Sequence, residues 1–274
     1  MSTDVPETKA ASSGASPEAP GFHFRRLWSW RPVSDRQAGD AVVSNFLLHW
    51  FPAKANRVSL SWSYSFWLGT VSAALLLLLV VSGLPLLFLY IPSVERAYAS
   101  VKDIEYVVTF GSWIRAVHRI SAHLMVVAVA LHLVRVFLTG AYKNALGGGQ
   151  KRPWNWVLGV AMLVSTLFLS FTGYLLPWDQ LAIWAITVGS NMARATPFLG
   201  HEGPGAQLLR LGDVPLIHAA DDARFALLGG TFVGEGALLR FYVLHCVGLP
   251  LGIAVLMAVH FWRVRKDGGI SGPL

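Results

Sequence analysis

The chain has little charge and a single cysteine. Charged residues make up 14% of its 274 residues, whereas an ordinary soluble protein has about a quarter. The lone Cys246 excludes a disulfide framework, a Cys-x-x-Cys-His site for covalent c-type haem, and zinc or iron–sulfur sites built mainly from thiolates. With 54% hydrophobic residues, 11 Trp and 15 Phe, the composition is typical of an integral membrane protein.

Residues 1–39 lack any long apolar run. They begin MSTDVPETKAASSGASPEAPG, which is small and polar, so we expect a disordered extension there and no secretory signal. Residues 40–63 contain DAVVSNFLLHWF, an amphipathic segment that we expect to lie along the membrane surface as a helix. Residues 268–274 are expected to form a short C-terminal tail.

Four segments are apolar and long enough to cross a bilayer, which takes about 20 residues. They span about 64–92, 113–141, 155–177 and 238–263. The sequence therefore predicts an all-α integral membrane protein, in which residues 64–267 form a bundle of four transmembrane helices behind the amphipathic surface helix.

Lys and Arg gather on one side of this bundle. The net charge of +7 would suit nucleic acid, but the basic residues concentrate in the N-terminal region, the loop between the second and third helices, and the C-terminal tail. The positive-inside rule then places these parts and both termini in the cytoplasm and argues against nucleic-acid binding. The second and fourth helices consequently run inward, parallel to each other.

Each inward-running helix carries one pair of widely spaced histidines. His118 and His132 are fourteen residues apart, so they leave nearly the same face about 21 Å apart along the axis. His245 and His260 are fifteen apart, with Pro250 between them to disturb the twist. Pairing the outer two and the inner two gives two stacked bis-imidazole sites, which suit non-covalent b-type haems that transfer electrons.

Histidines in membrane helices also have roles that involve no haem. A lone buried histidine is more often a hydrogen-bonded structural residue, and His123 is interpreted in this way. Zinc would need more ligands at each level than the apolar neighbours supply. A four-helix transporter that relays protons through histidines is a further alternative.

Glycines on the outward-running helices repeat the histidine interval. Gly69 and Gly83 are fourteen residues apart, as are Gly159 and Gly173. Glycine lets a helix backbone approach a flat ring closely, although glycines in membrane helices also serve helix–helix contacts. Two matching pairs favour room for two macrocycles.

Arginines flank the histidines of the second helix. Arg115 and Arg119 lie near His118, and Arg135 lies three residues after His132. Guanidinium groups bind carboxylates in a bidentate fork, so these arginines are candidates for haem propionates. Extension to the membrane interface would explain the same positions.

Several separated motifs occur in order between residues 55 and 274: HRISAHLMVVAVALHLVRVFLTGAY, GYLLPWDQ, RFYVLH and RKDGGISGPL. Together they closely resemble cytochrome b, specifically the short, split cytochrome b6 form. The resemblance implies that His118 and His245 hold a low-potential haem on the outer side. It also implies that His132 and His260 hold a high-potential haem on the inner side.

The resemblance further implies a subunit of a quinol:cytochrome c (or similar acceptor) oxidoreductase in a bacterial inner membrane or an equivalent energy-transducing membrane. The implied partners are a Rieske iron–sulfur protein, a c-type cytochrome and a subunit IV-like membrane protein, in a dimeric complex. The family's quinol-oxidising PEWY motif is not in this sequence, so no catalytic residue is assigned, and GYLLPWDQLAIW would supply one wall of that site. Electrons would pass from outer quinol to inner quinone, coupled to proton translocation.

Three features depart from or extend this resemblance: Trp67, an insertion in the outer loop, and the N-terminal extension before residue 40, which lies outside the common core of the family. Trp67 stands where b6 proteins carry a cysteine that attaches an extra haem, so a covalent third haem is not expected. Residues 200–226 form an insertion in the outer loop that contains His201 and His218, which we interpret as a partner-contact surface rather than a metal site. A di-haem membrane anchor of a hydrogenase or formate dehydrogenase would share the histidines but not these motifs.

Three polar residues follow the last helix on the inner side: Arg265, Lys266 and Asp267. They are candidates for an inner quinone site, where they would exchange protons with the quinone. Positive-inside anchoring explains the two basic residues equally well.

Overall fold

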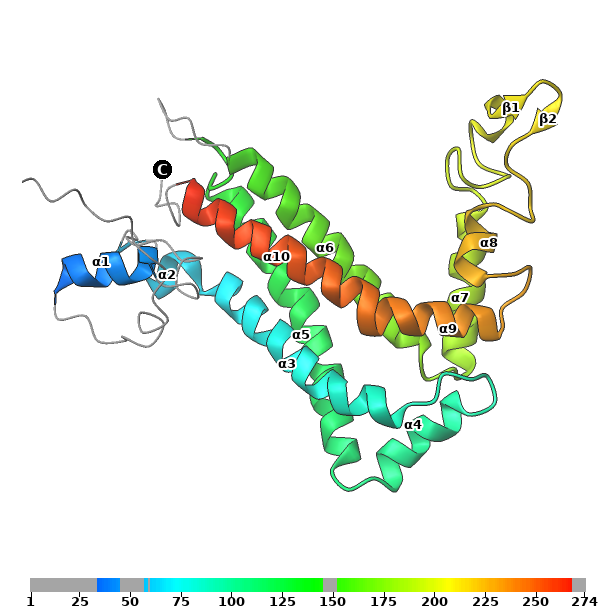
Figure 1. Ribbon diagram of the computed structural model, residues 1–274, viewed down its shortest axis with the longest axis horizontal. Helices are drawn as coiled ribbons and strands as arrows, with labels where there is room; N and C mark the ends of the chain where they lie inside the picture. The colour runs from blue at the N-terminus through cyan, green and yellow to red at the C-terminus, as the bar shows by residue number, and fades with distance from the viewer. Residues whose placement is uncertain (1–33, 45–56, 59, 145–151, 268–274) are drawn as a thin grey trace, which may run out of the picture. The chain divides into compact units, whose positions relative to one another are not determined.

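The computed structural model describes residues 34–44, 57–58, 60–144 and 152–267, and these are mostly helical (Figure 1). The chain divides into two compact units, residues 1–49 and 50–274. In the first unit, α1 (Asp35–Ser44) starts within the stretch expected to be disordered, so residues 35–39 are helical. Residues 1–33, most of the predicted surface segment and the tail 268–274 lie outside the described residues.

Four helical runs are long and apolar enough to cross a membrane: α3 (Leu68–Leu89), α5 (Gly111–Leu138), α6 (Arg152–Leu175) and Glu235–Lys266. The fourth run consists of α9 (Glu235–Val243), the π-helical turn η4 (Leu244–Gly248) and α10 (Leu249–Lys266). The prediction of a helical, multi-pass membrane protein with four transmembrane helices is confirmed, and each helix ends within a few residues of its predicted limits.

Short elements join these helices. α2 (Trp62–Ser65) precedes α3, and α4 (Ala97–Tyr106) lies between α3 and α5. The loop from α6 to α9 contains α7 (Gln180–Ala193), the 3₁₀ turn η3 (Ala206–Leu208), the strands β1 (Arg210–Leu211) and β2 (Val214–Pro215), and α8 (Ala223–Leu228). The sequence did not predict α4 or α7, because both are short and lie beside long apolar segments.

Local chemistry explains several of the boundaries. α7 begins after Asp179, whose carboxylate accepts a hydrogen bond from the Ala182 amide at 2.9 Å, as expected of an N-cap. α5 begins at Gly111, where a side chain would collide with the carbonyl of Ile104. Glycine therefore lets α5 start directly against α4.

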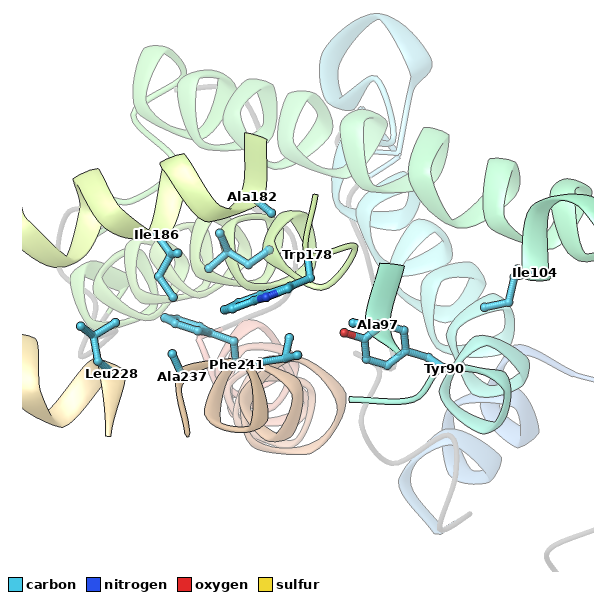
Figure 2. Close-up of a cluster of buried hydrophobic side chains, with 11 residues drawn as sticks. Tyr90, Ala97, Ile104, Trp178, Ala182, Ile186, Leu228, Ala237 and Phe241 are labelled. Carbon is cyan, nitrogen blue, oxygen red and sulfur yellow. The ribbon is translucent and has the colours of Figure 1, made fainter. Parts of the chain in front are cut away.

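The bundle is built from three helix pairs: α3 packs on α5, α5 on α6, and α6 on α10. Leu76, Met125 and Ile253, from three different helices, form a small buried cluster. A larger buried cluster joins α4, α7, α8 and α9 to the ends of α3 and α6. Figure 2 shows Trp178 close to Ile186 of α7 and Phe241 of α9, so the loop elements are packed onto one end of the bundle.

Candidate functional site

His118 of α5 and His245 of η4 face each other across the bundle. Their ring centres are 6.2 Å apart with the planes at 74°. A metal–imidazole bond is about 2 Å long and a ring nitrogen lies about 1 Å from its ring centre, so two rings on one metal ion have centres roughly 6 Å apart. The separation of this pair therefore fits an iron held between two imidazoles.

Hydrogen bonds leave the Nε2 atoms of these two histidines available. The Nδ1 of His245 lies 3.0 Å from the Leu169 carbonyl, which can only accept, so Nδ1 carries the proton. The Nδ1 of His118 lies 3.0 Å from Oγ of Ser82, whose own proton is donated to Leu78. The Ser82 hydroxyl oxygen therefore accepts a hydrogen bond from Nδ1 of His118. In each ring Nε2 keeps the lone pair that a metal ligand needs.

His132 and His260 form the second pair. Both are partly buried. α5 and α10 run in the same direction (Figure 1), as the charge distribution of the loops predicted. His123, interpreted as structural, points to an exposed face of α5.

Three of the four predicted glycines lie directly against a ligand candidate. A Cβ added to Gly173 would lie 2.5 Å from Cε1 of His245, and one added to Gly83 would lie 3.1 Å from Cε1 of His118. Both distances are shorter than nearly all real Cβ contacts. These two glycines therefore make room for the rings of the outer pair.

The inner level is asymmetric. A Cβ at Gly69 would lie 3.3 Å from Cε1 of His132, but a Cβ at Gly159 would meet only Cδ1 of Leu133, at 3.9 Å. Gly159 is thus the one predicted glycine at which an added Cβ would meet no histidine.

The π-helical turn η4 explains the unequal histidine spacing. The Leu249 amide donates to the Leu244 carbonyl, five residues back, so the turn absorbs one extra residue compared with an α-helix. Pro250 has no amide proton and its ring would clash with the carbonyl four residues earlier, that of Cys246. The fifteen-residue interval from His245 to His260, which includes one π turn, therefore matches the fourteen-residue interval from His118 to His132 on α5. The sequence signal was the odd spacing together with Pro250.

The three candidate arginines differ in their surroundings. Arg135 donates from Nε to the Tyr64 carbonyl at 3.2 Å and lies 4.3 Å from the centre of the Tyr64 ring. Its Nη2 is buried and has no hydrogen-bond partner among the described residues, as expected if an anion completes the site. Arg115 instead pairs with Glu105 at 2.6 Å, and Arg119 is exposed.

The residues after His260 form a partly buried polar group. Arg263 bonds Asp267 at 3.0 Å, and both side chains are largely buried. Arg265 has a buried Nη1 with no hydrogen-bond partner in the described part of the chain, whereas Lys266 lies over the Trp262 ring at 4.8 Å. Arg263 was not among the residues predicted for this site, although its spacing of four residues from Asp267 on a helix indicates a possible ion pair.

Trp67 caps the start of α3 with a positive φ of 51°. Its indole Nε1 donates to the Leu60 carbonyl at 3.2 Å. The indole, about half exposed, thus stands two residues before Gly69, at the level of the inner histidines.

The loop histidines are engaged with carboxylates. The ring of His201 lies 2.5 Å from the buried Asp222, which also accepts from the Phe225 amide and caps α8. Burial alone would raise the pKa of the Asp222 carboxyl, but the hydrogen bonds from His201 and Phe225 outweigh it and lower that pKa. His218 pairs with the exposed Asp221. No group of three or more His, Cys, Asp or Glu in the described ranges could hold a metal ion.

The chain is similar to known proteins. Residues 54–205 match the family described as Cytochrome b/b6/petB. The cytochrome b6 of Oltmannsiellopsis viridis is 41% identical over 207 residues, which cover 76% of this chain and 84% of that protein. The cytochrome b6 of Synechococcus elongatus is 40% identical over 207 residues, which again cover 76% of this chain and 84% of that protein.

A solved structure is also similar. One chain of "Hyperthermophilic respiratory Complex III" matches with a TM-score of 0.60 and 26% identity, and the match covers 77% of this chain and 49% of that chain. This chain therefore corresponds to about half of that larger protein. The family match and the identity to the b6 proteins together establish that the chain belongs to the cytochrome b/b6 family, which implies binding of haem b.

Proposed function

We propose that the chain is the di-haem cytochrome b subunit of a quinol:acceptor oxidoreductase of the Complex III type. The observation that carries this proposal is the His118–His245 pair, whose rings lie 6.2 Å apart with both Nδ1 atoms hydrogen-bonded. Two non-covalent b-type haems, when bound, supply one-electron redox chemistry and carry electrons between the two faces of the membrane.

The residues of this chain divide the work of binding. His118 and His245 are the ligands proposed for the outer, low-potential haem, and His132 and His260 for the inner, high-potential one. Ser82 and Leu169 orient the outer rings through their Nδ1 atoms.

Other residues make room for the histidine rings and would balance the charge of the haem propionates. Gly69, Gly83 and Gly173 leave space beside the rings. Arg135, with its unpartnered buried Nη2, is the strongest candidate for a propionate. Arg115 is already paired with Glu105 and Arg119 is exposed, so both are weaker candidates for a propionate. Gly159, where an added Cβ would meet no histidine, is a weaker candidate for making room beside a ring.

The proposed substrate is a quinol oxidised on the outer side, with quinone reduced on the cytoplasmic side. The buried, unpartnered Nη1 of Arg265 supports a role near the inner quinone. Asp267 forms an ion pair with Arg263. Its proposed role is to orient that arginine, unless quinone binding separates the pair. Both termini are proposed to be cytoplasmic, in a bacterial inner membrane or an equivalent membrane.

The partners proposed on the strength of the family are a subunit IV-like protein carrying PEWY, a Rieske iron–sulfur protein and a c-type cytochrome, in a dimeric complex. The similarity to one chain of a respiratory Complex III supports a place in a multisubunit complex.

Redox titration of the purified protein, followed by acid–acetone extraction, tests the proposal. We expect two b-type components of different potential and complete extraction of both haems. A chain without haem absorbance would indicate a histidine-relay transporter and contradict the proposal. Haem left on the polypeptide would contradict the interpretation of Trp67.

A di-haem anchor of a hydrogenase or formate dehydrogenase would also contain two haems. Quinol-dependent reduction of a c-type cytochrome by the intact complex separates it from the proposed function. If a complex that contains both haems lacks that activity, the proposed haem sites remain supported but the quinol:acceptor oxidoreductase function is contradicted.

A further inference from the structure

The insertion between α7 and α8 contains a β-hairpin that extends away from the helices (Figure 1). β1 and β2 pair with Arg210 opposite Pro215 and Leu211 opposite Val214. Gly212, with φ of 65°, allows the two-residue turn between them. The hairpin is therefore a regular element with two distinct faces.

One face of the hairpin is entirely aliphatic. Side chains alternate along a strand, so Leu209, Leu211, Val214 and Leu216 share one face. Leu211 is 76% exposed, Val214 60% and Leu216 52%. Arg210 lies on the other face and donates to the Asp213 carbonyl at 2.6 Å. Exposed apolar surface of this kind marks a contact with a partner or with lipid.

Charge favours lipid over a soluble protein. Between residues 208 and 217 the only charged side chains are Arg210, on the opposite face, and Asp213, in the turn. A soluble partner would be expected to meet a polar rim around an apolar centre. The hairpin offers no such rim on this face.

Other exposed apolar side chains lie between the membrane-spanning helices and the hairpin. α7 packs against α6 and has no charged residue in its sequence QLAIWAITVGSNMA. Its side chains Leu181, Trp184 and Val188 are exposed along one face, and exposed Phe198 and Leu199 follow in the loop. The segment that connects α6 to the hairpin therefore also presents apolar side chains outward.

The backbone of the hairpin also suits an apolar environment. Hydrocarbon demands that amide and carbonyl groups be satisfied internally. The strand pairing does this in part, the Leu216 amide donates to the Leu209 carbonyl at 2.8 Å, and Pro215 has no amide proton to satisfy. The open edges of a two-stranded hairpin limit its depth to the boundary between headgroups and acyl chains, about 5–10 Å.

Polar side chains hold the base of the insertion. Arg194 at the end of α7 pairs with Glu202, and His201 bonds Asp222 at 2.5 Å. A polar base below an aliphatic tip matches the change from headgroups to acyl chains.

We propose that the aliphatic face of this hairpin lies on the lipid bilayer, in the leaflet at the α7 end of the bundle. It would act as a shallow membrane contact that fixes the position of the insertion. The inference requires only that the chain spans a membrane and does not depend on the haem sites.

Spin labels on neighbouring positions of one strand test the proposal. Leu211→Cys and the matched control Arg210→Cys are made in a Cys246→Ala chain and reconstituted, in the intact complex, into phosphatidylcholine vesicles. Collision with oxygen reports lipid exposure and collision with a water-soluble nickel chelate reports water exposure. We expect the oxygen-to-nickel ratio to be several-fold higher at 211 than at 210.

Equal and high nickel access at both positions would overturn the proposal, because the hairpin would then lie in water. Low access of both reagents at 211 would also overturn it, because the face would be covered by protein. Val214→Cys, on the same face, must agree with Leu211→Cys. Unchanged haem absorbance in each variant shows that a negative result does not come from misfolding.

Discussion

Each histidine proposed as a ligand serves one level of the bundle, so the two levels can be separated by substitution. His132→Ala is expected to remove about half of the haem, leaving the outer pair, His118 and His245, with their hydrogen bonds to Ser82 and Leu169. Haem per polypeptide and the redox titration measure this. His123→Ala is the matched control on the same helix and should keep both haems. Equal loss of both haems in His132→Ala would contradict separate sites.

The glycines give a graded prediction. Gly173→Ala puts a Cβ 2.5 Å from the His245 ring, whereas Gly159→Ala puts one no closer than 3.9 Å to a leucine methyl. Overpacking of this kind typically costs about 1–3 kcal/mol, so Gly173→Ala should lower the thermal midpoint and the occupancy of one haem. Gly159→Ala should do neither. A larger effect at 159 than at 173 would show that the observed contacts do not govern these positions.

Helix α10 and its π turn make a prediction about spacing. The turn η4 accommodates one residue more than an α-helix would. Deleting Gly248 together with Pro250→Ala should leave both haems bound, because the fourteen-residue spacing then fits a regular helix. Inserting one alanine after Gly248 should rotate one histidine by about 100° and lose a haem. Haem per polypeptide measures both effects. Loss of a haem in the deletion variant, with both haems kept in the insertion variant, would contradict this explanation of the histidine spacing.

The N-terminus of α8 makes a prediction about pH. Because the pKa of Asp222 is lowered in the folded chain, its contribution to stability is present above the ordinary carboxyl pKa of about 4. That contribution is lost as the pH falls through the lowered value. Asp222→Ala should lose it at neutral pH, together with about 1 kcal/mol from the helix cap. Hydrogen exchange of the Phe225 amide measures both, and unchanged exchange in the variant would contradict the role of Asp222.

The whole bundle predicts a single orientation in the membrane. An even number of crossings puts the two ends of the four-helix bundle on the same side, and the basic residues in the last turn of α10, Arg263, Arg265 and Lys266, predict that this side is cytoplasmic. A protease site appended to the C-terminus should be cleaved in inverted vesicles and protected in intact spheroplasts. Cleavage in spheroplasts would reverse the proposed sides of both haems.

Periodicity and charge in the sequence determined much of this protein. Four apolar runs had to be membrane helices, because only satisfied backbone can cross lipid. The histidines at matched intervals had to share faces, because a helix repeats every 3.6 residues. These are local rules, so the sequence alone was sufficient to predict the four membrane-spanning helices and to propose the candidate ligands.

Tertiary contacts decided what local rules cannot. Only the packed helices show that Gly173 touches His245 while Gly159 touches no histidine, that Arg115 is paired with Glu105, and that Arg263 holds Asp267. The π turn and the hairpin of the insertion likewise depend on hydrogen bonds that no composition signal reports. Spacing determines which face a side chain leaves, but which neighbour it meets is set by the helix that packs there.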